Sequence, residues 1–528
     1  MNRHTDQSFF SCQLLCFRSL SLLVIYLTMT TLFGTASAAG ITIRVTPFSG
    51  DNASSSAQQI IIKLLKSDIE NDPLLKGFVD IGEFPNQEVS LIVGGEVTPS
   101  EKGEMFHPKV TAPKAQEAAH YAISLPTGFV TPQTASPIFP YQKTTLLSAQ
   151  PIKEPILLLA FVHAVLLLEK EKWQEASIKL NDVMDVYRAD KNWLEYAHVQ
   201  RTIGISYRTL GDMGNASEQN FRRAINLFQE SGILFQKEKT GIQYGMIQND
   251  IGLTYQRLAA LGSEPAQHLN LSINALNEAI RVAKDQQKKI NVAIAHNNIA
   301  LSYKELASWG IDPERNLRLA IKILHEAENV WKEQKDEPNS EMTQYNLGMT
   351  YQSLASWGVE PIPNLKNAIK TLQETASRWK ETPSVGSYAM AQSSLGASVQ
   401  ALASWGVDSE KNLKQAVDLL NDAARLLKEQ QNKIGYSSTV ANLGLSYQAL
   451  AKRDIDSVAN FRRSIDSLQE AATLWKEQNN RAGFVMAKNN LGVSYQALAQ
   501  NNIEPEKNKD LSDQSFKEAQ GPKAPVSK

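Results

Sequence analysis

The chain has few cysteines for its length: Cys12 and Cys16 are the only two in 528 residues. Both precede the N-terminal cleavage site described below, so we expect the mature protein to contain no disulfide and no thiolate metal site. No cysteine follows that site, which also argues against a lipoprotein. An exported chain of this kind has to be stabilised by packing alone.

An excess of charge of either sign is also missing. The 54 lysine and arginine residues are balanced by 55 aspartate and glutamate residues, which leaves a net charge of −1. Such a chain has no global positive field to concentrate nucleic acid or an anionic bilayer. We therefore expect no nucleic-acid partner.

Known catalytic motifs are absent as well. The sequence contains no phosphate-binding glycine loop, no His-Glu-x-x-His and no Gly-x-Ser-x-Gly elbow. The histidines do not cluster in the sequence, and we expect each to be a packing or surface residue. We therefore predict a protein that is not an enzyme and that has no metal ion or cofactor.

One long apolar run is present, from Leu20 to Phe33. It follows Arg3 and Arg18 and precedes Ala36-Ser37-Ala38, the small-x-small pattern that signal peptidase accepts. We interpret residues 1–38 as a signal peptide cleaved after Ala38, so the mature protein would lie in the periplasm or outside the cell. An uncleaved anchor is the alternative. No other stretch is apolar enough for a stable membrane span after cleavage.

The first mature segment, residues 39–98, is predicted to form a small α/β domain. Ile41 to Phe48 alternate like a strand, residues 60–69 have the spacing of an amphipathic helix, and 78–81 and 89–97 are apolar strand-like runs. These residues resemble the N-terminal domain of TolB and related TolB-like modules, in which a Val-x-Pro-Phe strand precedes a helix and a Leu-Ile-Val-Gly-Gly-Glu-Val strand follows. The resemblance implies an exported accessory module. The TolB propeller is absent, so its partners do not carry over.

Residues 99–155 are rich in proline, and we predict a partly extended linker there. Beyond it, one unit returns at a fixed interval of 48 residues. The small residue at its centre occurs at Gly204, Gly252, Ala300, Gly348, Gly396, Gly444 and Gly492. A fixed period of this size is typical of a solenoid, in which each unit buries its apolar face on its neighbours.

Two spacings within the unit resemble the tetratricopeptide repeat (TPR), whose pattern runs Leu-Gly-x-x-Tyr and then Ala-x-x-x-Phe. They are Leu347-Gly348-x-x-Tyr351 and Ala320-x-x-x-Leu324. The glycine-to-alanine distance is 20 residues, whereas the first unit keeps the family's spacing of 12. We interpret this as eight residues added between the helices. We predict a mainly α fold: an α-solenoid of eight TPR-like helix pairs over residues 156–519, preceded by the α/β domain and followed by a disordered tail, 520–528.

The added stretch, Ala307 to Pro313, has the composition of a helix end followed by a helix start. We expect Gly310 to adopt a left-handed conformation, Asp312 to provide the N-cap oxygen, and Pro313 to take the first helical position.

Short polar residues return two positions before each central small residue, and amides are frequent four positions after it. The TPR resemblance implies that these positions line the concave surface, where asparagines in some members hold an extended peptide backbone. An amide can donate and accept at once. The peptide-binding candidates are Asp250, Asn298, Asn346, Asn442, Asn490, Gln352, Gln448 and Gln496. The alternative is that these residues only hydrogen-bond adjacent repeats to each other.

Methionines and tryptophans also recur in register. Met246, Met342, Met390 and Met486 suit either a hydrophobic groove or the space between repeats. Trp309, Trp357 and Trp405 either stack on sugars or cover helix ends against the next repeat.

Together these features predict an exported scaffold that binds a protein or peptide partner in the concave groove. The alternative is an accessory protein that binds a saccharide or assists polymer secretion in the cell envelope. The sequence leaves the partner and the oligomeric state open.

Overall fold

A computed structural model describes the strands between residues 41 and 151, part of the segment 59–70, and residues 173–520 except 190, 192, 213, 215, 382–384 and 479. The predicted signal peptide, the first helix of the first repeat (156–168) and residues 521–528 of the predicted tail lie outside the described residues. The described residues between 59 and 70 are helical, where the sequence predicts a helix.

The strands form one mixed sheet in the order β2-β1-β3-β4-β5, with β6 paired to β4. β1 pairs in parallel with β2 and β3, and the β3–β4, β4–β5 and β4–β6 pairs are antiparallel. The bounds are β1 Ile41–Val45, β2 Val79–Gly82, β3 Leu91–Ser100, β4 Gly103–Thr111, β5 Thr144–Leu146 and β6 Gln150–Pro151.

This sheet extends beyond the segment for which strands were predicted. β3 continues to Ser100, and β4, β5 and β6 lie within residues 99–155, where the sequence predicts a linker. The prediction rested on recurring proline, but proline is compatible with a strand wherever its missing N–H is not required. Pro108 lies within β4, opposite Gly95.

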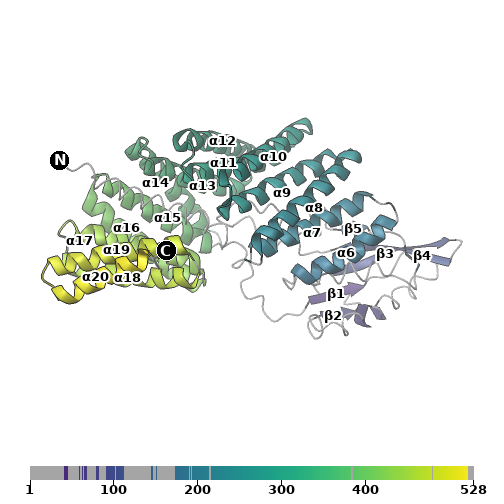
Figure 1. Ribbon diagram of the computed structural model, residues 1–528. Helices are drawn as coiled ribbons and strands as arrows, with labels where there is room; N and C mark the ends of the chain where they lie inside the picture. The colour runs from purple at the N-terminus through teal and green to yellow at the C-terminus, as the bar shows by residue number, and fades with distance from the viewer. Residues whose placement is uncertain are drawn as a thin grey trace, which may run out of the picture. The chain divides into compact units, whose positions relative to one another are not determined.

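The rest of the described chain is helical (Figure 1). We call the helices that contain the repeat glycine or Ala300 the A helices: α7 (Trp193–Asp212), α9 (Gly241–Ala260), α11 (Lys289–Ser308), α13 (Glu337–Ser356), α15 (Val385–Ser404), α17 (Lys433–Ala451) and α19 (Arg481–Gln500). The B helices are α6 (Trp173–Ala189), α8 (Ser217–Lys237), α10 (Pro265–Asp285), α12 (Pro313–Gln334), α14 (Pro361–Lys380), α16 (Ser409–Glu429), α18 (Ser457–Glu477) and α20 (Pro505–Gln520).

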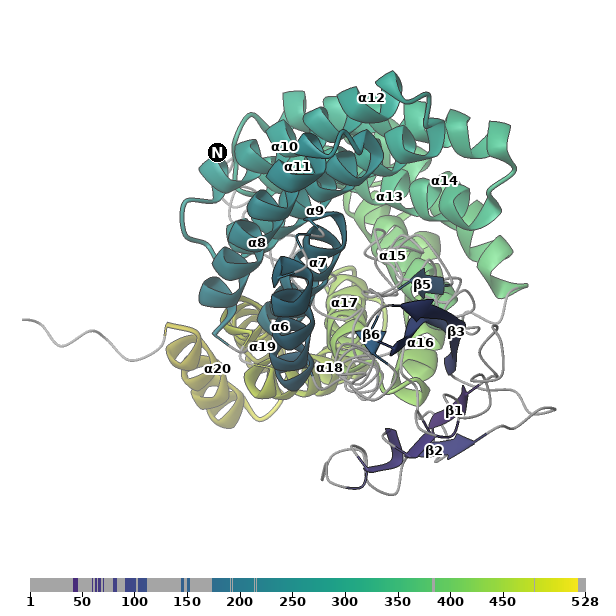
Figure 2. The same ribbon diagram turned by 90° about the vertical axis from the view of Figure 1, so that its right-hand side faces the viewer.

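The chain divides into two compact units inside α11, between Ala295 and His296. Within the earlier unit α7, α8, α9 and α10 pack consecutively. Within the later unit the same holds from α12 to α20, and both views show α18, α19 and α20 side by side (Figures 1 and 2). The array is therefore mainly α, with the consecutive helix-pair packing of an α-solenoid.

The repeat glycine brings each A helix close to the B helix that follows. A Cβ added at Gly348 would lie 2.7 Å from Cγ of Leu372, and one added at Gly444 would lie 2.8 Å from Cγ of Leu468. In both pairs the two residues are 24 positions apart, so the glycine and the later apolar residue form one contact that repeats along the array. At Ala300 a methyl group is accommodated in a core cluster with Leu324.

The turn between the A and B helices confirms two predictions and corrects two. Gly310 has a φ of +77° and Pro313 begins α12, as expected. Asp312 does not provide the N-cap oxygen: it has a φ of 37° and no side-chain cap hydrogen bond. The turn holds only residues 309–312, so the added residues mostly lengthen the helices instead of forming an inserted loop.

A row of asparagines near the start of the B helices stabilises these turns, and the sequence analysis missed it. Nδ2 of Asn316 donates to the carbonyl of Ile311 at 2.8 Å, and Asn364 does the same to Val359. The equivalent bonds come from Asn412, Asn460 and Asn508. Their interval of 48 residues was the available signal.

Candidate functional site

All eight predicted peptide-binding residues lie on A helices. Asp250 is on α9 and Asn298 on α11, while α13, α17 and α19 each carry one asparagine and one glutamine of the set. The buried members are Asp250, Asn298, Asn346, Gln352 and Gln448. Asn442 and Asn490 are half-buried and Gln496 is exposed.

Asp250 is the centre of a buried ion-pair cluster between two A helices. Its Oδ2 accepts from Nε of Arg201 at 2.6 Å and its Oδ1 from Nη1 of Arg208 at 3.1 Å, and all three residues are buried. A second pair joins the same helices, from Nε of Arg257 to Oδ1 of Asp212 at 2.9 Å. Burial raises the pKa of Asp212. Asp250 therefore links α7 to α9 and is not presented to a ligand.

Gln448 has the same role between α17 and α19. Its Nε2 donates to the carbonyl of Asn490 at 3.0 Å and to Oγ of Ser494 at 2.8 Å. The side chain of Asn490 bonds within its own helix, to the carbonyl of Met486. For Asp250, Gln448 and Asn490, the contacts favour the alternative interpretation, in which the polar row holds the helices together.

Similar links from one A helix to the next occur one residue before the predicted row. Nδ2 of Asn297 donates to Oγ1 of Thr343 at 2.9 Å, and the hydroxyls of Ser393 and Thr439 lie 2.7 Å apart. Each pair is separated by 46 residues, two fewer than the repeat, so the sequence did contain this signal. Buried polar contacts thus join α7 to α9, α11 to α13, α15 to α17 and α17 to α19.

The remaining members of the predicted row are arranged differently. Nδ2 of Asn346 is buried and has no hydrogen-bond partner among the described residues. The amides of Gln352, Asn442 and Gln496 make no hydrogen bond within the described part of the chain either. Since buried polar groups are nearly always hydrogen-bonded, the unused donor of Asn346 requires an explanation.

Lys304 on α11 adds a cation at a position equivalent to that of Arg208 and Gln448. Those two residues reach the next A helix, whereas Lys304 has no hydrogen bond or ion pair to any residue that the structure describes. Burial lowers the pKa of Lys304. The structure therefore has an ammonium group and an amide donor, both unused, on the successive A helices α11 and α13.

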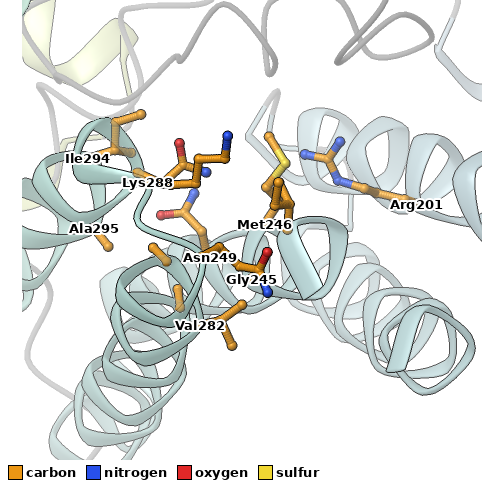
Figure 3. Close-up of a pocket in the computed structure, with 13 residues that line it drawn as sticks. Arg201, Gly245, Met246, Asn249, Val282, Lys288, Ile294 and Ala295 are labelled. Atoms are coloured by element: carbon orange, nitrogen blue, oxygen red, sulfur yellow. The ribbon is translucent and has the colours of Figure 1, made fainter. Parts of the chain in front are cut away.

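A small cavity lies in the earlier unit, among α9, α10 and the start of α11. Its volume is about 30 Å³, which suits a water molecule better than a peptide side chain. Lys288 and Asn249 lie on one side of it, and Met246 and Arg201 on the other (Figure 3). Of the two cations that line the cavity, Arg201 is already paired with Asp250 and Lys288 is exposed.

The four recurring methionines fill space in the core, whereas the recurring tryptophans of the turns are more exposed. Met246, Met342, Met390 and Met486 are all buried, which fits their interpretation as packing between repeats. Trp357 packs with Ala307 and Leu317 of the preceding repeat, not the next one as expected. Trp405 is 38% exposed. The row of sugar-stacking tryptophans is therefore not supported at Trp357.

Among the residues with a described placement, no group of three or more His, Cys, Asp or Glu side chains could hold a metal ion. Within the same set, no helix combines the length and the apolar character needed to cross a membrane.

No family model and no curated protein matches the chain. Among solved structures, the apo form of the quorum sensor NprR from B. thuringiensis is similar at 14% identity and a TM-score of 0.35, covering 66% of this chain and 99% of that one. A circular tandem repeat protein is 13% identical with a TM-score of 0.26, covering 69% and 94%. The P58(IPK) TPR domain is 10% identical with a TM-score of 0.16, covering 69% and 99%. By the pairing, spacing and packing of its own helices, the described array consists of TPR-like helical repeats.

Proposed function

We propose that this chain is an exported, non-catalytic scaffold whose A helices bind an extended polypeptide segment of a partner protein. The observation that carries the proposal is the amide of Asn346: its Nδ2 is buried and has no partner among the described residues. A buried donor without an acceptor costs roughly 1–3 kcal/mol. An acceptor oxygen supplied by a ligand would remove that cost.

Other polar side chains of the A helices suit a polypeptide main chain. Gln352 on the same helix and Asn442 on α17 have amides that can pair with a backbone carbonyl and a backbone N–H at once. Lys304 contributes a donor on α11. Since amides recognise the main chain whatever the side chains are, this set supports a ligand in an extended conformation.

Export and the α/β domain are parts of the same proposal. Export rests on the signal-like pattern of residues 1–38. The parallel pairing of β1 with β2 and β3 supports a small α/β domain ahead of the repeats, in line with the resemblance to TolB-like modules. N-terminal sequencing of protein from the envelope fraction should begin at Ala39. An intact N-terminus or a cytoplasmic product would contradict export.

The binding proposal can be tested with peptides selected from a random library on the purified mature chain. We expect Asn346→Ala and Asn442→Ala each to weaken the best peptide about 5-fold, measured by fluorescence anisotropy, since one hydrogen bond contributes about 1 kcal/mol. Asn346→Ala should leave the thermal stability unchanged or higher, because the free chain makes no bond through this amide.

Two matched controls define the outcome. Gln373→Ala, on the exposed face of α14, should change neither binding nor stability. Gln448→Ala should lower stability and leave peptide binding intact, because its amide bonds to α19. Selection of no peptide, together with retention of an envelope polysaccharide, would contradict the proposal and favour a saccharide-binding accessory protein.

A further inference from the structure

In the later unit, the residue type at one position of the turn after each A helix changes along the array. Trp357 is the first residue after α13, and Trp405 is the first after α15. The equivalent residues of the next two repeats are Arg453, two residues after the end of α17, and Asn501, the first residue after α19. All four are in register, 48 residues apart. The position is therefore occupied by tryptophan in the middle of the array and by polar residues near its end.

Trp357 shows what the large side chain does at this position. It packs against a cluster of Ala307, Leu317 and Leu354, and its ring would lie 3.9 Å from a Cβ added at Gly310 in the preceding turn. The indole thus covers the turn of the repeat before its own. Arg453 replaces this cover with a hydrogen bond, from Nη2 to the carbonyl of Ala403 at 3.3 Å.

Asn501 provides no such cover. Its Nδ2 donates to the carbonyl of Ala497 in its own helix at 2.9 Å, so the side chain turns back along α19. The cluster beneath it is otherwise the same: Ala451, Phe461 and Leu498 lie three repeat lengths after Ala307, Leu317 and Leu354. The apolar floor that an indole covers at one turn is thus left without an indole here.

A pocket with a volume of about 320 Å³ is present at this place. Its floor includes Ala451, Phe461 and Val493, and its edge includes Lys452, Asp454 and Asn501. The pocket is of the size that binds small organic groups. It lies at the turn end of α17, α18 and α19, and the amides of Gln496 and Gln500 on α19 also line it.

One cation and one anion lie at the edge of the pocket. Lys452 donates to Oε1 of Gln448 at 3.3 Å and Asp454 accepts from Oγ of Ser457 at 3.4 Å, but neither forms an ion pair with any residue whose placement is described. A carboxylate can accept from an indole N–H, and an ammonium group can pair with a neighbouring acid. Both charges therefore match one ligand, a tryptophan beside an acidic group.

We propose that the pocket between α17, α18 and α19 binds a tryptophan side chain of a partner protein, next to an acidic residue, in the place that Trp357 fills from within the chain at an earlier turn. This site does not depend on the binding of a main chain by Asn346. Aromatic side chains bring a large apolar area and a polar edge, which the floor and Asp454 can each contact.

The test uses the full mature chain and N-acetyl-L-tryptophan, followed by saturation-transfer NMR. We expect a Kd of roughly 0.1–1 mM, in line with the efficiency of small ligands. Asn501→Trp should fill the pocket from within, weaken the probe at least 10-fold and raise the Tm. Gln373→Trp, which adds an exposed indole on α14, should leave probe binding unchanged.

Two further arms separate the alternatives. Asn346→Ala should not alter binding of the probe, so failure of the proposed function is distinguishable from failure of this site. N-acetyl-L-tryptophanamide, which lacks the carboxylate, should bind more weakly. The inference would be overturned if the probe did not bind at a concentration 5-fold above a Kd of about 1 mM, or if Asn501→Trp bound it as well as the native chain does. Displacement of the probe only by a neutral oligosaccharide would also overturn it.

Discussion

Residues at the same position of different repeats have different roles, and the position alone does not show which role each residue has. Asp250 and Asn346 occupy the same place in their repeats, yet the first is paired with two arginines and the second has an unused donor. The difference comes from the preceding A helix, which offers Arg201 and Arg208 to Asp250. A role assigned by register therefore has to be checked against the neighbouring repeat.

The repeat glycine gives the first prediction. Gly348→Ala should destabilise the chain by about 1–3 kcal/mol, because the new methyl group would overlap Leu372 and the overlap outweighs the higher helix propensity of alanine. Gly386→Ala is the control, since a Cβ there meets nothing within 4 Å. Urea unfolding measures both. Equal stability of the two variants would refute the close-contact role.

His198 on α7 predicts a pH dependence. Burial, with Arg201 nearby, lowers the pKa of His198 to about 4, and its ring packs edge-on against Phe235. Below the ordinary pKa of 6.5 this histidine takes up a proton in the unfolded chain, whereas in the folded chain it does so only near pH 4. Stability therefore falls as the pH drops from about 6.5 to about 4. Between pH 7 and pH 4.5 this loss is about 2 kcal/mol.

His198→Gln should remove that part of the pH dependence, which urea unfolding at pH 7 and pH 4.5 measures. A variant that keeps the full loss at pH 4.5 would show that another group causes it.

At the scale of the element, the sequence predicted the helix boundaries more accurately than the contacts within the turns. Gly310 and Pro313 correctly predicted where α11 ends and α12 begins, because glycine adopts a positive φ without steric cost and the proline ring fixes φ at a helical value. The N-cap at Asp312 was wrong because the four-residue turn places this residue in the left-handed region. Asn316, three residues into the helix, makes the turn contact instead.

The sequence predicted the position of the polar row on the A helices, but it did not predict the role of each residue in that row. Period and residue type placed it on the A helices, but the partner of each side chain depends on which residue the next repeat presents. The strands beyond residue 98 were missed since strand pairing is not local.

The turn asparagines yield an element-scale prediction. Asn364→Ala should cost about 1–2 kcal/mol, because it leaves the carbonyl of Val359 without its 2.8 Å bond. Asn364→His should recover part of that loss: His268 holds the equivalent place on α10, and its Nδ1 lies 2.8 Å from the carbonyl of Ser263. Thermal unfolding distinguishes them, and a histidine variant as unstable as alanine would contradict the account.

At the scale of the whole molecule, each helix packs on its neighbours in sequence within each unit, so perturbations should stay local. Asp250→Ala leaves Arg201 and Arg208 buried without their carboxylate, at a cost of about 3–5 kcal/mol. Hydrogen exchange should then show lower protection in α7, α8 and α9 and unchanged protection in α17 to α20. Uniform loss of protection would indicate a single cooperative array.

We propose that unused amides of the A helices bind a partner's main chain. The most direct test replaces single amide bonds of the selected peptide by esters, whose carbonyls are weaker acceptors, and measures Kd for the native chain and for Asn346→Ala. We expect one ester to weaken binding to the native chain several-fold and to have no further effect on Asn346→Ala. Additive losses at every ester position, or binding that depends only on the peptide's side chains, would contradict the proposal.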